Sequence, residues 1–250
     1  LNDYVGYLRD VKEMRNTTIG KQLSFLKWFL RWAFKKGVHQ NNAYDSYKPK
    51  LKSTQKKIIF LTWDELNRLR EFKIPSNKQA LERVRDVFLF QCFTGLRYSD
   101  VFNLRRSDIK GDHIEVTTVK TSDSLIIELN NHSKAILDKY KDVAFEYDKV
   151  LPVITNQKMN DYLKELAGID EPIRQTYYKG NERIDDVTPK YALLGTHAGR
   201  RTFICNALAL GIPPQVVMKW TGHSDYKAMK PYIDIADDIK ANAMSKFNQL

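Results

Sequence analysis

The sequence changes character most sharply at one basic segment, KPKLKSTQKK, which occupies residues 48–57. This segment contains a proline, no acidic residue and no hydrophobic periodicity, which is typical of a linker between folded parts. Most of the chain on either side of it repeats apolar side chains at helical spacing. We therefore predict two parts, a helical one over residues 1–47 and a larger one over 59–250, joined by a basic linker over 48–58.

Charge is unevenly distributed between these parts. The chain has 41 Lys and Arg against 30 Asp and Glu, a formal net charge of +11. Residues 1–57 hold 13 of those basic residues and only 4 acidic ones. Such an excess favours a polyanionic partner, usually nucleic acid, although charge alone is equally compatible with a merely soluble basic protein. We expect phosphate contacts to concentrate before residue 58.

Cysteine content and hydropathy indicate in which cellular compartment the protein is expected. Cys92 and Cys205 lie in apolar surroundings, so we predict buried thiols in a reducing cytoplasm rather than a disulfide. No apolar run reaches the length of a membrane span, and no signal peptide opens the chain. The chain begins at Leu1 inside a predicted helix, which suggests a fragment that lacks an N-terminal domain.

Periodicity predicts the remaining elements. Helices are expected over the first 47 residues, over 79–93, 132–147 and 156–167, and from 196 onward with a break at 211–214. Thr62 starts a capping box. A β-hairpin is expected over 113–119 and 124–129, and a second one within 170–190 that turns at Gly180. The predicted fold class is therefore mostly α with small β-hairpins. Helical spacing over 236–250 leaves open whether that segment packs on its own domain or on a neighbouring copy.

Four short segments combine residue types that suit phosphate chemistry. They read TGLRYSDVFNL, TVKTSD, THAGRRTF and TGHSDYKAMKPYIDI, and they contain Arg97, Lys120, His197, Arg200, His223 and Tyr232. Taken singly, each residue has an ordinary structural explanation, such as a surface ion pair, a solvated lysine or a core tyrosine.

Their local settings indicate an anion site. His197 and Arg200 are three residues apart on a predicted helix and so share a face. Arg97 follows a glycine turn where a helix begins, and free N–H groups there attract oxyanions. Two guanidinium groups suit the non-bridging oxygens of a phosphate. No Asp, Glu and His cluster has metal-ligand spacing, so we predict neither a metal nor another cofactor.

In this order and at these separations, the segments resemble the tyrosine recombinase family, also called the phage integrase family, including integrases of phages and conjugative transposons. The resemblance spans roughly residues 59–240, and residues 196–232 carry its most specific part. The basic helical front also resembles the family's core-binding domain. The resemblance implies a two-domain architecture, with a helical core-binding domain and a mixed α/β catalytic domain that close around duplex DNA.

The resemblance also implies a reaction, the cleavage and rejoining of DNA strands at specific sites through a 3′-phosphotyrosine intermediate. In that reaction Tyr232 is the nucleophile and Lys120 protonates the leaving 5′ oxygen. Arg97 and Arg200 clamp the phosphate. His197 and His223 donate to its oxygens or transfer protons. Asp100 corresponds to an acidic residue that orients such neighbours. Two features are less typical of the family. The strand IIELN lacks a proline that many relatives have, and Pro231 directly precedes Tyr232. Both concern only the detailed geometry of the site.

The implied partners are double-stranded DNA attachment sites, further copies of the chain in a homo-tetramer on two duplexes, and DNA-bending accessory proteins. A membrane is not among them, and the expected location is the nucleoid in the bacterial cytoplasm. The sequence names neither the target site, the mobile element nor the direction of the reaction.

Three alternatives remain at this point. A type IB topoisomerase uses similar residues to relax DNA, but the integrase-like spacing argues against it. A non-catalytic DNA-binding protein on the same scaffold conflicts with the complete residue set. A metal-free ribonuclease that uses His197, His223 and Lys120 leaves Tyr232 and both arginines unexplained.

Overall fold

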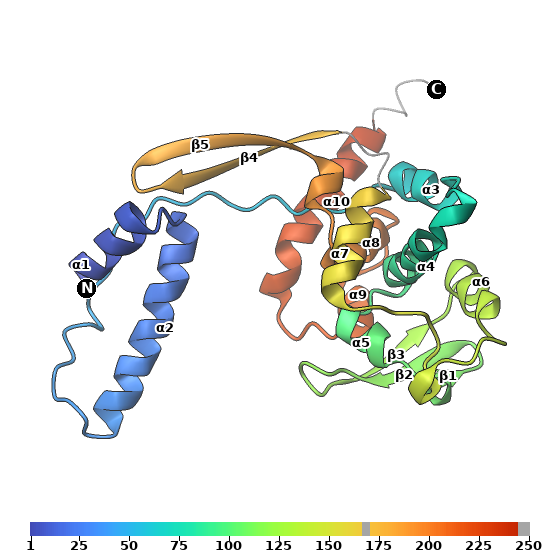
Figure 1. Cartoon of the computed structure of the whole chain (residues 1–250), viewed down its shortest axis with the longest axis horizontal. Coiled ribbons are helices and arrows are strands. Elements are labelled where there is room, and N and C mark those ends of the chain that lie inside the picture. The colour runs from blue at the N-terminus through green and yellow to red at the C-terminus, as the bar shows by residue number, and fades with distance from the viewer. Residues whose placement is uncertain (167–170, 245–250) are drawn as a thin grey trace. The chain divides into compact units, whose positions relative to one another are not determined.

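The computed structural model describes residues 1–166 and 171–244, and it is mostly helical with two small antiparallel sheets (Figure 1). The fold class predicted from the sequence, mostly α with small β-hairpins, is thereby confirmed. The chain divides into two compact units. Unit 1 comprises Leu1–Lys57 and Pro172–Thr188, and unit 2 comprises Ile58–Glu171 and Pro189–Leu250. Within the described residues, no helix is long and apolar enough to cross a membrane.

The helices of unit 1 are α1 (Asn2–Gly6), a short π-helical stretch (Tyr7–Val11) and α2 (Asn16–Lys35). Val5, Leu8, Ile19 and Leu23 form their shared core. The far side of α2 exposes aromatic side chains, namely Phe25, Trp28, Phe29 and Trp32.

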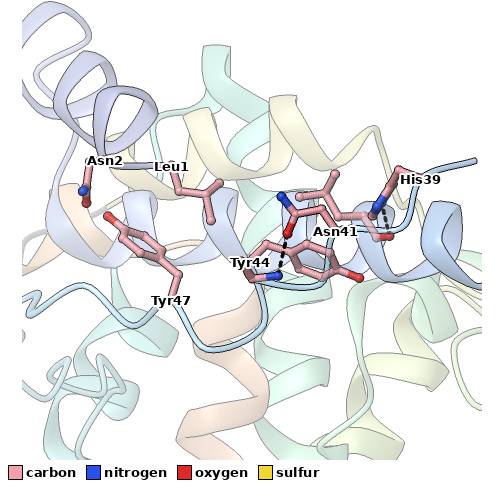
Figure 2. A pocket seen from close by; sticks show the side chains of 8 residues that line it. Leu1, Asn2, His39, Asn41, Tyr44 and Tyr47 are labelled. Atoms are coloured by element: carbon pink, nitrogen blue, oxygen red, sulfur yellow. Dashed lines mark hydrogen bonds between the residues drawn. The ribbon is translucent and has the colours of Figure 1, made fainter.

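Helix α2 ends at Lys35, just before Gly37, so helices do not continue to residue 47 as predicted. Gly37 has a φ of +73°, a left-handed conformation that favours glycine and stops helices. The chain then packs back on α2, where His39 Nε2 lies 3.0 Å from the Leu30 carbonyl oxygen and Tyr44 is buried. Figure 2 shows this loop around a cavity of about 490 Å³, with Tyr44 and Tyr47 among its lining. Side-chain contacts rather than helical hydrogen bonds hold this segment.

The second predicted hairpin forms and turns at Gly180, with strands β4 (Pro172–Lys179) and β5 (Glu182–Pro189). Their place in the sequence predicts that these residues belong to the larger part of the chain, whereas they fold with unit 1. Asn16, which is 2% exposed, accepts a hydrogen bond from Gly180 N (2.8 Å) and donates to Gly180 O (2.8 Å) and Lys52 O (2.9 Å). Thr54 also donates to the Thr176 carbonyl. The basic segment over 48–57 is therefore packed against the hairpin and α2, not a free linker.

Unit 2 contains most of the helices and the three-stranded sheet, in the order β1–β2–β3. In chain order its elements are α3 (Trp63–Glu71), α4 (Gln79–Thr94), α5 (Tyr98–Asn103), β1 (Ile109–Lys110), β2 (His113–Thr117), β3 (Ser124–Glu128), α6 (Asn131–Lys139), α7 (Asn156–Glu165), α8 (Thr196–Ala209), α9 (Pro214–Thr221) and α10 (Tyr226–Met244). Short 3₁₀ turns occur at Ser76–Lys78, Arg106–Asp108, Glu146–Asp148 and Lys190–Leu193.

Helices α4 and α8 pack closely at the centre of unit 2. A side chain at Gly199 would place its Cβ 2.9 Å from Gln91 Cβ, so the two helices approach more closely than a larger residue allows. Cys92 and Cys205, on these two helices, are buried and free, as predicted. This packing fixes α8, which carries two of the predicted site residues.

The helices of the structure begin and end only in part where the sequence predicted. The predicted capping box forms, because Glu65 N donates to Thr62 Oγ1 (3.4 Å) and Thr62 N donates to Glu65 Oε2 (2.7 Å). The helix predicted over 132–147 is wrong beyond Lys139. The residues after it are not helical. Their carbonyl oxygens, at positions 140, 141 and 143, accept hydrogen bonds from the Arg106 guanidinium. The end of the helix predicted over 156–167 falls partly outside the described residues.

Candidate active site

All six residues singled out by their motifs lie in unit 2, on segments far apart in the sequence. Arg97 precedes α5, Lys120 occupies the turn between β2 and β3, His197 and Arg200 lie on α8, His223 follows α9, and Tyr232 lies in α10. The predicted hairpin over 113–119 and 124–129 is confirmed as β2 and β3. Lys120 lies within the turn that joins these two strands.

Arg200 is the buried centre of this group, with a relative exposure of 2%. Its Nη1 donates to Gly95 O at 2.9 Å, and its Nη2 donates to Thr221 O. Gly95 sits at the end of α4 with a φ of +73°, and a Cβ there would lie 2.5 Å from the Phe203 ring. Neutral carbonyls thus orient the guanidinium without cancelling its charge. Burial and, secondly, the charge of Arg97 lower the Arg200 pKa to about 10, which still leaves it protonated at neutral pH.

Arg97 is oriented differently, beside a carboxylate. Its Nη1 lies 3.9 Å from Asp100 Oδ2, and among the described residues this buried nitrogen has no hydrogen-bond partner. Asp100 is itself buried, and its Oδ1 accepts a hydrogen bond from Val119 N at 3.0 Å. Asp100 therefore ties the Arg97 loop to the turn that carries Lys120. Asp100 Oδ2 has no hydrogen-bond partner in the described part of the chain either. A buried polar group left unpaired costs about 1–3 kcal/mol, so this donor is available to a ligand.

The turn that carries Lys120 is closed by its own backbone. Thr118 N donates to Asp123 O (2.9 Å), and Ser122 N donates to Thr118 O (3.0 Å). The Lys120 side chain is exposed, and within the described part of the chain its ammonium makes no ion pair. Its charge nevertheless acts on His197. The lysine is thus an exposed cation on an anchored turn.

Two histidines complete the group, and both are held neutral. His223 Nδ1 lies 2.8 Å from Thr221 Oγ1 and 3.4 Å from Arg200 Nη2. These two contacts orient the ring so that Nδ1 faces Thr221 and the buried arginine. Burial, followed by the charges of Arg200 and Arg97, lowers the His223 pKa to about 4. Burial and neighbouring cations, of which Arg201 acts most strongly, also lower the pKa of His197, although its edge is exposed.

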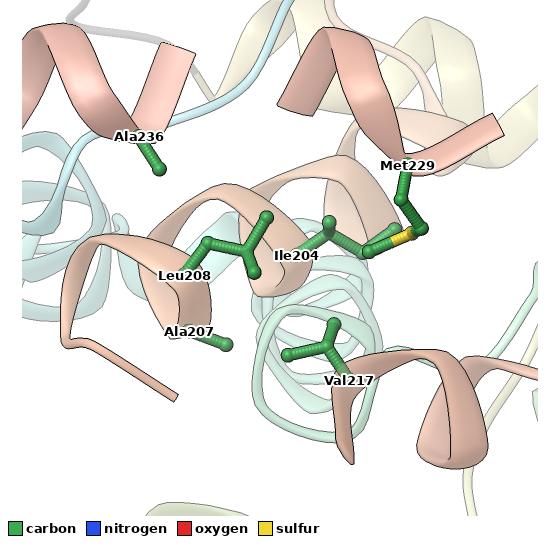
Figure 3. Close-up of a cluster of buried hydrophobic side chains, with 6 residues drawn as sticks. All are labelled: Ile204, Ala207, Leu208, Val217, Met229 and Ala236. Carbon is green, nitrogen blue, oxygen red and sulfur yellow. The ribbon is translucent and has the colours of Figure 1, made fainter. Parts of the chain in front are cut away.

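Tyr232 is positioned by the packing of α10 on α8 and α9. A cluster of six buried side chains joins these helices, namely Ile204, Ala207, Leu208, Val217, Met229 and Ala236 (Figure 3). Tyr232 is partly buried against this cluster, close enough for its phenolate form to influence Arg200. Helix α10 runs through Pro231 without interruption. Of the C-terminal residues noted for their helical spacing, the side chains of Ile239, Ala243 and Phe247 lie outside the described part of the structure.

Sequence reasoning missed Thr221, whose side chain is fully buried. Its carbonyl orients Arg200, and its hydroxyl bridges Val217 O (2.6 Å) and His223 Nδ1 (2.8 Å). The only signal was its place directly before the Gly-His turn. Among the described residues, no group of three or more His, Cys, Asp or Glu is placed to hold a metal ion. The arrangement is therefore a cluster of fixed cations and neutral donors that suits a phosphate.

Comparisons with known proteins agree with this chemistry. A model of the phage integrase family matches residues 59–238, so the chain belongs to the phage integrase family of tyrosine recombinases. A tyrosine recombinase of Thermosipho africanus is 25% identical over 235 residues, which cover 93% of this chain and 76% of that protein. A lambda integrase dimer bound to a COC′ core site is 18% identical with a TM-score of 0.68, covering 94% of this chain and 78% of that one. A lambda integrase tetramer bound to a Holliday junction has a TM-score of 0.63 at 17% identity, covering 89% and 62%.

Proposed function

We propose that Arg97, Lys120, His197, Arg200, His223 and Tyr232 together form the active site with which this recombinase cleaves and rejoins DNA. One observation carries the proposal. The charge of Arg97 lowers the pKa of Arg200, and a buried Arg97 nitrogen, 3.9 Å from Asp100 Oδ2, has no hydrogen-bond partner among the described residues. Like charges gathered around an unpaired donor are unfavourable until an anion binds between them. A DNA phosphodiester supplies such an anion.

The same groups favour the transition state of phosphoryl transfer. Negative charge there spreads over the phosphoryl oxygens, which two planar guanidinium groups can contact. The neutral His223 ring adds a hydrogen-bonding group beside the two arginines. Because repulsion by cations contributes to the lowered pKa of both histidines, a bound phosphate raises those pKa values and prepares the rings for proton transfer. One preplaced donor of this kind is worth about 3–4 kcal/mol of barrier.

Tyr232 supplies the nucleophile. Its oxygen attacks phosphorus and forms a 3′-phosphotyrosine bond, while the bond to the 5′ oxygen breaks. Lys120 donates a proton to that leaving oxygen, and the lysine's place on a turn gives its Nζ the required reach. A 5′ hydroxyl from another strand then attacks the phosphotyrosine and restores a phosphodiester. The bond energy is conserved in the protein–DNA link, so ATP is not needed.

The assembly follows from the proposed chemistry. We infer that unit 1 serves as the DNA-binding domain beside catalytic unit 2, and that a homo-tetramer acts on two double-stranded attachment sites. The known tetramer on a Holliday junction supports this assembly by analogy. DNA-bending accessory proteins are part of the proposal, as is a location at the nucleoid. Neither DNA relaxation alone nor DNA binding without chemistry is favoured by the family match.

Exchange of the tyrosine tests the proposal. Tyr232→Phe keeps the packed ring and removes the attacking oxygen, so it should abolish the covalent protein–DNA adduct. DNA binding should stay within about twofold, because loss of one hydroxyl that leaves the packing in place is near neutral. Tyr226→Phe is the matched control, because Tyr226 begins the same helix and is 52% exposed. Loss of the adduct in Tyr226→Phe, with retention in Tyr232→Phe, would reject the assignment.

A further inference from the structure

Thr221 is a buried residue that contacts two members of the proposed active site. It ends α9 directly before Gly222, whose φ of +60° turns the chain toward His223. The Thr221 carbonyl accepts a hydrogen bond from Arg200. Its hydroxyl oxygen lies 2.6 Å from the Val217 carbonyl oxygen and 2.8 Å from His223 Nδ1. The side chain is fully buried, so solvent does not compete for these two contacts.

The Thr221 hydroxyl has a single proton for these two neighbours. The Val217 carbonyl oxygen can only accept, and a separation of 2.6 Å places the hydroxyl proton between the two oxygens. The Met218 carbonyl oxygen, at 3.5 Å, is too distant to compete for it. A lone pair of the hydroxyl must then make the contact with His223, so the proton of that hydrogen bond lies on Nδ1. The two bonds form a chain from the ring through the hydroxyl to the backbone.

One contact of His223 favours the opposite tautomer. Arg200 Nη2 lies 3.4 Å from Nδ1, and a guanidinium can only donate. That separation is near the long limit of a hydrogen bond, and the same Nη2 already donates to the Thr221 carbonyl. The hydroxyl contact, at 2.8 Å, is much shorter and therefore decides where the ring proton lies. The other charged or titratable groups around the ring are Arg97, His197, Asp123 and Lys219.

We propose that Thr221 is a positioning residue, whose hydroxyl holds the proton of neutral His223 on Nδ1 and leaves Nε2 as the basic nitrogen of the ring. The inference rests on the proposed function, in which His223 acts on a DNA phosphate. Within the described part of the chain Nε2 makes no hydrogen bond, and the ring is only partly buried, so this nitrogen is available to a ligand. When a phosphate binds, Nε2 takes up a proton from solvent and donates it to a phosphate oxygen, while Nδ1 keeps its bond to the hydroxyl.

The tautomer is measured by ¹⁵N NMR on the full protein with labelled histidine. At neutral pH the ring is uncharged, because burial and neighbouring cations lower the pKa of His223 to about 4. The unaltered protein should show a protonated Nδ1 and an unprotonated Nε2. These signals are identified among those of the five histidines by their loss in His223→Asn.

Two exchanges at Thr221 form a matched pair. Thr221→Val keeps the branched shape and removes the hydroxyl, so the ring proton should move to Nε2 while Nδ1 accepts from Arg200. Thr221→Ser keeps the hydroxyl and should keep the proton on Nδ1. Both variants retain the backbone carbonyl that orients Arg200, and both should melt at a lower temperature, because one loses a buried hydrogen bond and the other a buried methyl group.

The rate of cleavage gives the second measurement. Thr221→Val should slow formation of the Tyr232 adduct by about 10–100-fold, the range found for partners that fix the tautomer of metal-bound histidines. Thr221→Ser should keep most of the rate. Equal losses of rate in the two variants would show a purely structural role and overturn the proposal.

The NMR signals need neither DNA nor activity, so they test the tautomer separately from the proposed function. A proton on Nε2 of His223 in the unaltered protein, or the same tautomer in the unaltered protein and in Thr221→Val, would also overturn the role of Thr221. Absence of any adduct in the unaltered protein would instead reject the proposed function.

Discussion

The two units hold their positive charge in opposite ways. In unit 2, Arg200 is buried and oriented by the carbonyls of Gly95 and Thr221. In unit 1, cations such as Lys21 and Arg174 are exposed around an open cavity. The first arrangement fixes a few charges at the cost of their hydration, and the second retains hydration and spreads many charges over a surface.

This difference separates chemistry from affinity. Buried charges are screened little by salt and act strongly over short distances, which suits a transition state. Exposed charges are screened and release counterions when they meet phosphates, which suits reversible binding. We therefore expect changes in unit 2 to alter rates more than affinity, and changes in unit 1 to alter affinity and its salt dependence more than rates.

After the complete loss expected for Tyr232→Phe, the largest expected rate effect concerns Lys120. Lys120→Ala should slow cleavage by about 10²–10⁴-fold, the usual contribution of a general acid. A substrate with sulfur at the 5′ bridging position should restore the rate, since a thiolate leaves without a proton. Single-turnover cleavage of both substrates measures this. Equal defects with oxygen and sulfur would contradict the role of Lys120 and leave the rest of the site untouched.

A somewhat smaller rate effect is expected at Arg200. Arg200→Lys keeps a charge but cannot span the carbonyls of Gly95 and Thr221 while it faces a phosphate. Cleavage should slow by about 10²–10³-fold, whereas DNA affinity at fixed salt should change little. Arg68→Lys, an exposed exchange on α3, is the matched control. A loss of affinity that exceeds the loss of rate would contradict the separation between the two units.

Deletion of residues 1–57 should instead lower DNA affinity more than it lowers the rate of cleavage. It removes 13 basic residues against 4 acidic ones, and it also removes Asn16, which holds the hairpin turn. The shortened protein should bind duplex DNA more weakly and with a shallower salt slope, by about 0.9 for each lost phosphate contact. Some adduct should still form at high protein concentration. Superimposable slopes for the two proteins would show that these basic residues do not contact phosphates.

The smallest effect is a difference in acid sensitivity. The pKa of His223 is lowered to about 4 in the folded protein, so the unfolded chain binds more protons between pH 4 and 6.5. The contribution of neutral His223 to the free energy of unfolding is therefore fully present above pH 6.5, and it is lost as the pH falls toward 4. His223→Asn should therefore show a smaller fall in melting temperature over that window.

His113→Asn is the control for this measurement, with an opposite sign. Hydrogen bonds to Asp112 and Glu115 raise the pKa of His113, so its contribution is present at low pH and lost as pH rises through its folded pKa. The two variants should change the pH profile in opposite directions. Parallel profiles for both variants would contradict the burial of His223 beside Arg200.

Local patterns in the sequence were sufficient for much of the fold. Thr62 was predicted to cap α3 and Gly180 to turn the second hairpin, and both predictions are confirmed, because capping boxes and tight turns depend on residues a few positions apart. The helix predicted over 132–147 failed because Arg106, which lies far away in the sequence, binds the carbonyls that would continue it. Periodicity contains no information about such a partner.

The site shows the same limit. Motifs indicated all six candidate residues, but their spacing could not show that Arg200 is held by carbonyls or that Thr221 lies behind His223. The location of the β4–β5 hairpin was missed for a related reason. Its attachment to unit 1 depends on Asn16, which is separated from Gly180 by more than 160 residues. Long-range contacts of single polar side chains leave no periodic trace in a sequence.

The proposed cationic site joins Tyr232 to a DNA phosphate without a metal. The unaltered protein is incubated with a nicked duplex that carries an attachment site, in excess EDTA, and the covalent adduct is digested and mapped by mass spectrometry. We predict a phosphotyrosine link at Tyr232, formed at the same rate with and without EDTA. An adduct on any other residue, or an adduct that forms only after magnesium is restored, would contradict the account.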